Sequence, residues 1–359
     1  MIETVEIKNF KSIQNAQIKF SPLTVLVGTN GAGKSNLMLA LAFLSHLSNH
    51  GLAAAVNYFG GFRNLLPQMA LESKQEQKIT FSVSMSLPSS QAKQVNSPLT
   101  IKYELEFGHT DLAATTEDVR ITHEKMSFDQ FLPPAESLLA DLTTPADTFR
   151  TRVSAIRRYE LPPSSKPIEP SHNGGQTSTL FALSSIRQPE KEASWNRILR
   201  TLATIAPHVE FGPPYSQKTE SIVSEGPNRA GSLKRDSWEF SGGMARALGI
   251  LFALETHPED GTLLIEEPEQ SLHPWAIRTL MEHIREVTSE RGIQVILTTH
   301  SPMVLERVYP NEVLIVERSE QEGTTFQTIK EILPYSDIAR GEVGELWVHG
   351  LLGGVPSYE

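Results

Sequence analysis

The chain has 359 residues, of which 39% are hydrophobic and 21% charged, and its net charge is −10. This length allows one large domain or two, and the composition is typical of a globular protein. The lack of cysteine excludes disulfides, a cysteine nucleophile and a thiolate zinc site. No apolar run reaches the roughly eighteen residues of a membrane span, and the first residues do not read as a signal peptide, so we expect a cytoplasmic protein with no membrane partner.

Basic residues gather in the middle of this acidic chain. Residues 150–236 hold 13 Lys and Arg against 8 Asp and Glu. The net charge argues against a protein coated in nucleic acid, but a local basic excess could form a phosphate-binding face. A solvated surface of mixed charge explains the excess equally well.

The N-terminal third is expected to be mainly β-structure. Residues 4–8 and 16–20 alternate between polar and apolar side chains and should pair as a hairpin. A buried strand at 23–27 and a helix at 36–47 follow. Period-two alternation predicts three antiparallel strands further on, at 78–87, 99–107 and 119–126.

The rest of the chain, from residue 129, is expected to begin with irregular segments and to end in alternating strands and helices. Residues 129–158 are expected to be helical and partly irregular, and residues 161–179, rich in Pro, Ser and Gly, to be a flexible loop. After them strands and helices alternate, which predicts a mostly parallel sheet with helices on both faces. The strands are expected at 261–265, 293–298 and 312–317, and the helices at 195–205, 246–255, 274–288 and 301–308.

Residues 28–35, GTNGAGKS, match the phosphate-loop pattern G-x-x-x-x-G-K-[ST] without a mismatch. Placed between a strand and a helix, such a loop wraps backbone N–H groups around a phosphate. Lys34 can reach the β- and γ-phosphates, and the Ser35 hydroxyl can bind Mg²⁺. The sequence therefore predicts ATP binding, with Asn30, Gly31, Gly33, Lys34, Ser35 and Asn36 as nucleotide contacts.

A second motif, LLIEEPE at 263–269, places two carboxylates at the end of an apolar strand. Sheets of the α/β class bind ligands at the carboxyl ends of their strands. We expect Glu266 to hold Mg²⁺ through water and Glu267 to orient and polarise the attacking water. Aspartate is usual at the first position, so the glutamate leaves the metal role of residue 266 open. A solvated acidic turn is the alternative.

Two shorter motifs complete the candidate site. Ser241, Gly242 and Gly243 open a helix and could form a second anion cradle, although Ser-Gly-Gly is also common in turns. Residues 298–302, TTHSP, follow an apolar strand, so His300 could hydrogen-bond a γ-phosphate or the attacking water. A purely structural histidine is the alternative.

The order of these four motifs resembles that of ABC-type ATPase heads. The segments IKNFKSI at 7–13 and EEPEQSLHP at 266–274 look like the SMC/RecF/OLD-like branch of those heads. The ending, residues 344–356, is similar to that of compact bacterial AAA family (AAA15/AAA21-like) predicted ATPases. The resemblance covers residues 1–107 and 237–359.

The resemblance implies a domain organisation and a dimer. The fold would be an α/β P-loop NTPase with an N-terminal antiparallel β subdomain in its first half, residues 1–107. An inserted, partly helical arm would follow at 108–236, and the second half of the head at 237–359. Such heads dimerise head to tail around two ATPs, so Ser241, Gly242 and Gly243 of one subunit would complete the site at Lys34 of the other. Residues 270–273 would lie at the seam.

The sequence therefore favours an ATP-hydrolysing switch. Its output would pass to DNA or to a separate nuclease-type effector protein, in DNA repair or anti-phage defence. Since Asp337 is the sole aspartate after His300, we expect no nuclease domain like that of OLD proteins in this chain. The alternatives are a transporter-type ATP-binding subunit and a non-hydrolysing scaffold that uses ATP as structural glue.

Overall fold

The computed structural model describes the main chain in ten segments, and everything below concerns these alone. The segment expected to be a flexible loop, 161–179, and the predicted anion contact Ser241 lie outside them. The segments are 1–72, 77–87, 99–108, 119–128, 145–159, 192–206, 210–211, 224–225, 242–333 and 338–355.

The N-terminal strands form an antiparallel lobe, as predicted. Neighbouring strands pair in the order β6-β5-β4-β1-β2, all antiparallel. Stacked phenylalanine rings fill its core, with Phe43 from helix α1 lying 5.4 Å from Phe107. The strands are β1 (Ile2–Phe10), β2 (Ile13–Lys19), β4 (Lys78–Leu87), β5 (Leu99–Gly108) and β6 (Arg120–Phe128).

The second part of the sheet is parallel, and it sets the position of the site. Its strands run in the order β12-β3-β11-β10-β7, each parallel to its neighbour. Their carboxyl ends therefore meet at one edge. The loops that follow β3, β10 and β11 emerge there, and they carry the phosphate-loop, EEPE and TTHSP motifs. The strands are β3 (Leu23–Val27), β7 (Ile156–Tyr159), β10 (Thr262–Glu266), β11 (Gln294–Thr299) and β12 (Val313–Ser319).

A strand that the sequence did not predict, β13 (Gly323–Thr328), joins the two parts. It pairs antiparallel with β12 along its length and meets β2 where Gly323 faces Ile13. The Thr324 N–H donates to the Ser12 carbonyl at 2.8 Å. The antiparallel lobe and the parallel core are thus one mixed sheet, and the lobe is not a detached subdomain.

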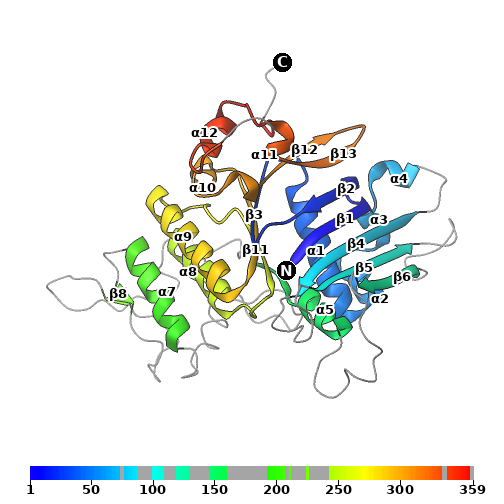
Figure 1. Cartoon of the computed structure of the whole chain (residues 1–359), viewed down its shortest axis with the longest axis horizontal. Helices are drawn as coiled ribbons and strands as arrows, with labels where there is room; N and C mark the ends of the chain where they lie inside the picture. The colour runs from blue at the N-terminus through cyan, green and yellow to red at the C-terminus, as the bar shows by residue number, and fades with distance from the viewer. Residues whose placement is uncertain are drawn as a thin grey trace.

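Helices cover both faces of the parallel strands (Figure 1). Leu26 and Ile296 point into the core beneath α1 (Lys34–His50) and α5 (Pro145–Ser154), whereas their neighbours Val25 and Leu297 point into the opposite core. Successive strand residues face opposite sides, so continuous apolar runs build both cores. The opposite core is covered by α7 (Glu192–Ile205), α8 (Gly242–Thr256) and α9 (Pro274–Arg291).

Of the segment 129–158, residues 129–144 lie outside the described residues, and for the rest the expectation was wrong in one respect. Helix α5 is present, but residues 156–159 form β7, the strand next to β10. In addition, Arg197 of α7 donates to both carboxylate oxygens of the buried Glu255 in α8, at 2.6–3.0 Å. Both segments thus pack within the head, although they belong to the predicted insertion 108–236; the boundaries of that insertion remain a prediction.

Short elements complete the described chain. None of its described helices is long and apolar enough to cross a membrane. The remaining elements are α2 (Leu52–Tyr58), α3 (Phe62–Leu65), α4 (Gln68–Glu72), β8 (Glu210–Phe211), β9 (Ser224–Glu225), α10 (Pro302–Leu305), the 3-10 helix η5 (Pro310–Glu312), α11 (Ile329–Ile332) and α12 (Val343–Val348).

Candidate functional site

The glycine loop lies between β3 and α1, as predicted, and packs against the β12–β13 hairpin. A Cβ on Gly28 would lie 2.1 Å from the Val316 carbonyl oxygen, and one on Gly33 would lie 2.1 Å from Thr324 Oγ1. Gly31, with φ +79°, has nothing within 4 Å of such a Cβ. The loop is therefore pressed against the hairpin at both ends and open at Gly31, which is the shape of a cradle for an anion.

Lys34, the first residue of α1, is only 6% exposed. Its Nζ donates to the carbonyl oxygens of Gly28 and Thr29, both at 2.9 Å. Burial lowers the pKa of Lys34, while the carboxylates of Glu267 and Glu266 oppose that shift. The ammonium group thus lies inside the loop, close to both acids.

Ser35 and Glu266 are brought into direct contact from opposite ends of the chain. The Ser35 hydroxyl donates to Glu266 Oε2 at 2.9 Å. The other oxygen, Oε1, accepts from Arg158 Nε at 2.8 Å and from a terminal Arg158 nitrogen at 2.6 Å. Both carboxylate oxygens of Glu266 are therefore engaged by side chains.

Ser35 and Glu266 together have the chemistry of a Mg²⁺ site. A hydroxyl and a carboxylate are the hard oxygen ligands that Mg²⁺ prefers, and Mg²⁺ normally keeps several waters and takes only one or two protein groups. Within the described residues, no cluster of three or more His, Cys, Asp or Glu side chains could hold a metal ion. The residues here suit an ion that substrate and water help to bind.

Glu267 follows directly on β10 in an uncommon backbone conformation. Its φ is +45°, and its N–H donates to the Thr298 carbonyl at 3.0 Å. A left-handed conformation at a non-glycine residue stores strain and is concentrated at functional sites. The Glu267 carboxylate lies 3.7 Å from His300 Nε2. The two predicted catalytic side chains are thus neighbours.

His300 stands at the carboxyl end of β11, in the predicted place. Burial lowers the pKa of its imidazole, the charge of Lys34 lowers it further, and Glu267 and Glu269 oppose the shift. A lowered pKa keeps the imidazole neutral at neutral pH. A neutral histidine can donate one hydrogen bond and accept another.

Two side chains that received no role from the sequence fix these loops. Arg246 donates to the carbonyl oxygens of Glu266 and Glu267, at 2.7 and 2.6 Å. Glu269 Oε1 accepts from the Thr299 hydroxyl at 2.7 Å and from the His300 N–H at 3.0 Å. Glu269 belongs to the EEPE motif and could have been suspected, whereas nothing in the sequence around Arg246 indicated its contacts.

Gly242 and Gly243 begin α8, and Gly243 lies against the chain just beyond Glu267. A Cβ on Gly243 would be 2.2 Å from the Ser271 carbonyl oxygen. The structure thus brings this helix start beside the loop 267–273 of the same chain. The role of residues 241–243 toward a second subunit is still a prediction.

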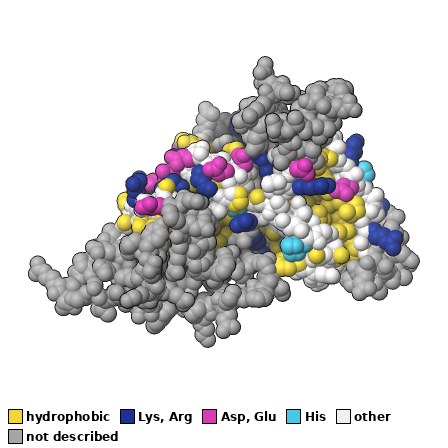
Figure 2. All heavy atoms as spheres, turned by 90° about the horizontal axis from the view of Figure 1, so that it is seen from below, with side chains coloured by type: hydrophobic (Ala, Val, Ile, Leu, Met, Phe, Trp, Pro, Cys, Tyr) yellow, Lys and Arg dark blue, Asp and Glu magenta, His cyan; other side chains and the backbone are white. Residues whose placement is uncertain are grey.

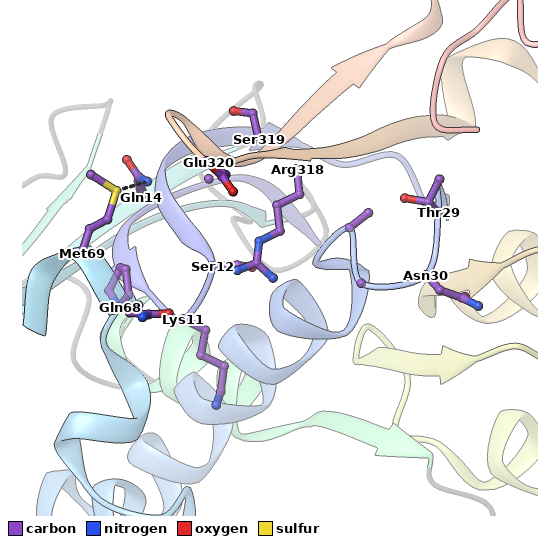
Figure 3. Close-up of a pocket in the computed structure, with 14 residues that line it drawn as sticks. Lys11, Ser12, Gln14, Thr29, Asn30, Gln68, Met69, Arg318, Ser319 and Glu320 are labelled. Carbon is purple, nitrogen blue, oxygen red and sulfur yellow. Dashed lines mark hydrogen bonds between the residues drawn. The ribbon is translucent and has the colours of Figure 1, made fainter. Parts of the chain in front are cut away.

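Asn36 Nδ2 donates to the Ser12 hydroxyl, which also lies 2.7 Å from Thr324 Oγ1. Asn30 lines an open cavity of about 650 Å³ beside the glycine loop, together with Gln68. Arg318 extends from the β12–β13 hairpin toward Ser12 in this cavity (Figure 3). The cavity is lined by Lys11, Ser12, Gln14, Thr29, Asn30, Gly31, Ala32, Pro67, Gln68, Met69, Arg318, Ser319, Glu320 and Gly323.

A glycine loop of this form, on a sheet of this topology, defines a P-loop ATPase head of the ABC/SMC type. A family model described as "AAA domain, putative AbiEii toxin, Type IV TA system" (AAA_21) matches residues 23–306. The chain therefore belongs to the AAA_21 family. The predicted family resemblance and fold class are confirmed.

Curated relatives are distant or similar over short stretches. An OLD nuclease of Thermus scotoductus is 25% identical over 327 residues, which is 84% of this chain and 59% of that protein. A DNA replication and repair protein RecF of Porphyromonas gingivalis is 53% identical over 51 residues, 14% of each protein. The methionine import ATP-binding protein MetN of Rhizobium meliloti is 33% identical over 90 residues, 24% of each. The chain thus spans little more than half of the OLD nuclease it matches.

Solved structures share the fold. An Smc head bound to the C-winged helix domain of ScpA gives a TM-score of 0.56 at 16% identity, covering 93% of this chain and 99% of the other. An Smc head bound to the C-terminal domain of ScpA from Pyrococcus furiosus gives 0.54 at 14% identity, covering 93% and 98%. At these identities the likeness concerns the fold alone.

Proposed function

We propose that this protein binds and hydrolyses ATP with Mg²⁺. The observation that carries the proposal is the meeting of two residue pairs at one sheet edge. Ser35 contacts Glu266 at 2.9 Å, and Glu267 lies 3.7 Å from His300. The first pair has the chemistry of a metal site and the second that of a water-positioning site, and both border the loop that ends in Lys34.

The chain's own groups divide the work of phosphoryl transfer. Backbone N–H groups of residues 30–35 hold the phosphates, and Lys34 exchanges its two carbonyl partners for phosphate oxygens. Ser35, with help from Glu266, would hold Mg²⁺, which when bound would supply charge neutralisation. Glu267 accepts a hydrogen bond from the attacking water and orients it, and neutral His300 donates to the γ-phosphate or to that water.

The nucleoside is proposed to occupy the cavity beside the loop. This cavity is lined in part by residues 29–32 of the glycine loop, and its described lining has no aromatic ring on which a base could stack. The polar and charged groups there, Arg318 and Glu320 among them, suit a ribose or a base edge. Binding energy would then come mostly from the triphosphate.

ATP is further proposed to close a head-to-tail homodimer, in which residues 241–243 of one subunit face the nucleotide of the other. The position of the start of α8 beside the loop 267–273 supports this arrangement, because that loop follows directly on Glu266 and Glu267. Hydrolysis would reopen the dimer. We also propose that the protein is cytoplasmic and that its output passes to DNA, or to a separate nuclease-type effector, in repair or antiviral defence. The proposed output is based on the similarity to an OLD nuclease and to RecF.

The surface does not by itself select DNA as the target. On the face seen in Figure 2, acidic and basic side chains are interspersed among the described residues. Binding of DNA is therefore proposed only as one possible output. If it occurs, its affinity should fall steeply as salt rises.

The mass of the Glu267→Gln protein, measured by light scattering with and without ATP and Mg²⁺, tests the proposal. We expect a monomer that becomes a dimer only with ATP, because the variant binds the nucleotide but does not consume it. The same variant carrying Lys34→Ala is the control and should stay monomeric. A mass that is unchanged by ATP would favour the scaffold alternative, and copurification with membranes would favour a transporter subunit.

A further inference from the structure

Arg158 contacts the carboxylate of Glu266. It lies on β7, a strand that carries none of the four sequence motifs, and its Nε and a terminal nitrogen both contact Oε1, at 2.8 and 2.6 Å. The second oxygen, Oε2, accepts a hydrogen bond from the Ser35 hydroxyl at 2.9 Å. The guanidinium thus restrains the orientation of the Glu266 carboxylate.

The ion pair between Arg158 and Glu266 is partly accessible to water, because the two side chains are 23% and 28% exposed. Two donors of one planar guanidinium on Oε1 restrain the position of that oxygen more closely than a single hydrogen bond would.

Orientation matters more for this carboxylate than for the aspartate usual at its position. Glutamate has an additional methylene and therefore an additional torsion to fix. The main chain of Glu266 is held, since its carbonyl accepts from Arg246 at 2.7 Å, but that contact does not act on the carboxylate. Among the contacts described for the Glu266 carboxylate, only Arg158 and Ser35 hold it.

We propose that Arg158 is a positioning residue of the metal site: it holds Glu266 so that Oε2 accepts a hydrogen bond from the Ser35 hydroxyl, which leaves the lone pairs of the Ser35 oxygen free for Mg²⁺. The proposal rests on the proposed Mg·ATP site. It also links the metal site to β7, a strand from the middle of the chain that pairs with β10. Arg158 acts through Glu266 and touches no substrate.

The test measures Mn²⁺ binding by electron paramagnetic resonance, with the non-hydrolysable analogue AMP-PNP, so that the readout does not depend on turnover. Arg158→Gln should raise the Mn²⁺ concentration for half-saturation by about tenfold, the usual size of a change in the groups that orient a metal ligand. Arg157→Gln is the matched control: Arg157 is the exposed neighbour on the opposite side of the strand, and its loss should change Mn²⁺ binding less than about twofold.

A double-mutant cycle separates orientation from other roles. Aspartate at position 266 is too short to keep both the Arg158 and the Ser35 contacts, so Arg158→Gln should have less than about a twofold effect in the Glu266→Asp background. An equal effect in both backgrounds would overturn the proposal, and so would unchanged Mn²⁺ affinity in Arg158→Gln alone.

Arg158→Lys completes the test and replaces the Gln variant if that protein does not fold. Lysine keeps the charge but cannot make the two-nitrogen contact, so we expect it to weaken Mn²⁺ binding as Gln does. Full Mn²⁺ affinity in Arg158→Lys would mean that charge alone is needed and would refute the positioning role. Failure of the wild type to bind Mn²⁺ with AMP-PNP would instead refute the proposed metal site itself.

Discussion

Gly243 lies directly against the main chain at Ser271. A Cβ on residue 243 would be 2.2 Å from the Ser271 carbonyl oxygen and 3.1 Å from its carbonyl carbon. The obstacle is backbone, not the end of a flexible side chain, so it cannot simply rotate away. The start of α8 and the loop after Glu267 are therefore set by one another, and the second glycine of the Ser-Gly-Gly motif has a structural function within its own chain.

Gly243→Ala should consequently move α8 or the loop 267–273. Overpacking of this kind typically costs about 1–3 kcal/mol of unfolding free energy, and we expect ATP turnover to fall about tenfold or more, as small displacements of catalytic groups do. Calorimetry and a phosphate-release assay measure the two effects. ATP affinity of the monomer should stay near wild type, since Lys34 is not touched. A variant as stable and as active as the wild type would contradict the close contact.

Lys34→Ala should abolish nucleotide binding. The ammonium already lies within the glycine loop, 2.9 Å from the Gly28 and Thr29 carbonyls, where it would meet phosphate oxygens. Titration calorimetry with ATP and Mg²⁺ should show at least about a hundredfold loss of affinity, in line with the loss of a buried charge-assisted contact. Lys330→Ala, at an exposed position of α11, is the control. Equal affinities in the two variants would rule out the loop as the site.

His300→Asn should reduce turnover while ATP binding persists. The imidazole lies 3.7 Å from the Glu267 carboxylate, and removal of a group that assists proton or water positioning typically costs about 10²–10⁴-fold. The control is His349→Asn, at an exposed position directly after α12, which should leave turnover unchanged. Because burial and Lys34 lower the pKa of His300, protonation of this group should depress turnover only below about pH 6.5. Loss of turnover with a midpoint above that pH would argue against a neutral His300.

Acid should destabilise the fold through His257. Burial, together with the charges of Arg157 and Arg291, lowers its pKa to about 3, against 6.5 in an unfolded chain. Between these values the unfolded state binds a proton that the folded state does not, so the free energy of unfolding falls by about 1.4 kcal/mol per pH unit as pH drops below 6.5. This loss ends near pH 3, below which both states are protonated.

Urea unfolding at pH 6.5 and pH 5 measures the effect. The wild type should lose about 2 kcal/mol more than His257→Gln over that interval. His349→Gln, at an exposed position, should behave like the wild type. Parallel losses in the wild type and in His257→Gln would show that His257 is protonated in the folded protein.

Arg318→Ala tests the nucleoside cavity. If Arg318 contacts the nucleoside side of ATP, its loss should raise KM by about tenfold with little change in kcat, the signature of binding lost equally in the ground and transition states. Arg200→Ala, an exposed arginine of α7, is the control. An unchanged KM for ATP would place the nucleoside outside this cavity.

Local pattern was sufficient for most elements. The strand at 23–27, the glycine loop and the helix after it are encoded by neighbouring residues: an apolar run, a fixed glycine spacing, then helix-forming side chains. The helices predicted at 195–205 and 274–288 were present for the same reason. Strands β7 and β13 were missed because a four-residue IRRY segment and the segment GTTFQT have little periodicity, and both are strands only because a neighbour pairs with them.

The sequence by itself determined the phosphate loop and the order of the four motifs, and hence the P-loop class, because backbone geometry and anion binding depend on residues that are adjacent along the chain. Only the tertiary structure decided which distant groups meet: Arg158 on Glu266, Arg246 on the carbonyls after β10, and Gly243 on Ser271. These contacts depend on strand order and helix placement. Such features arise when burial of the two cores outweighs the entropy of closing long loops, and no local pattern records them.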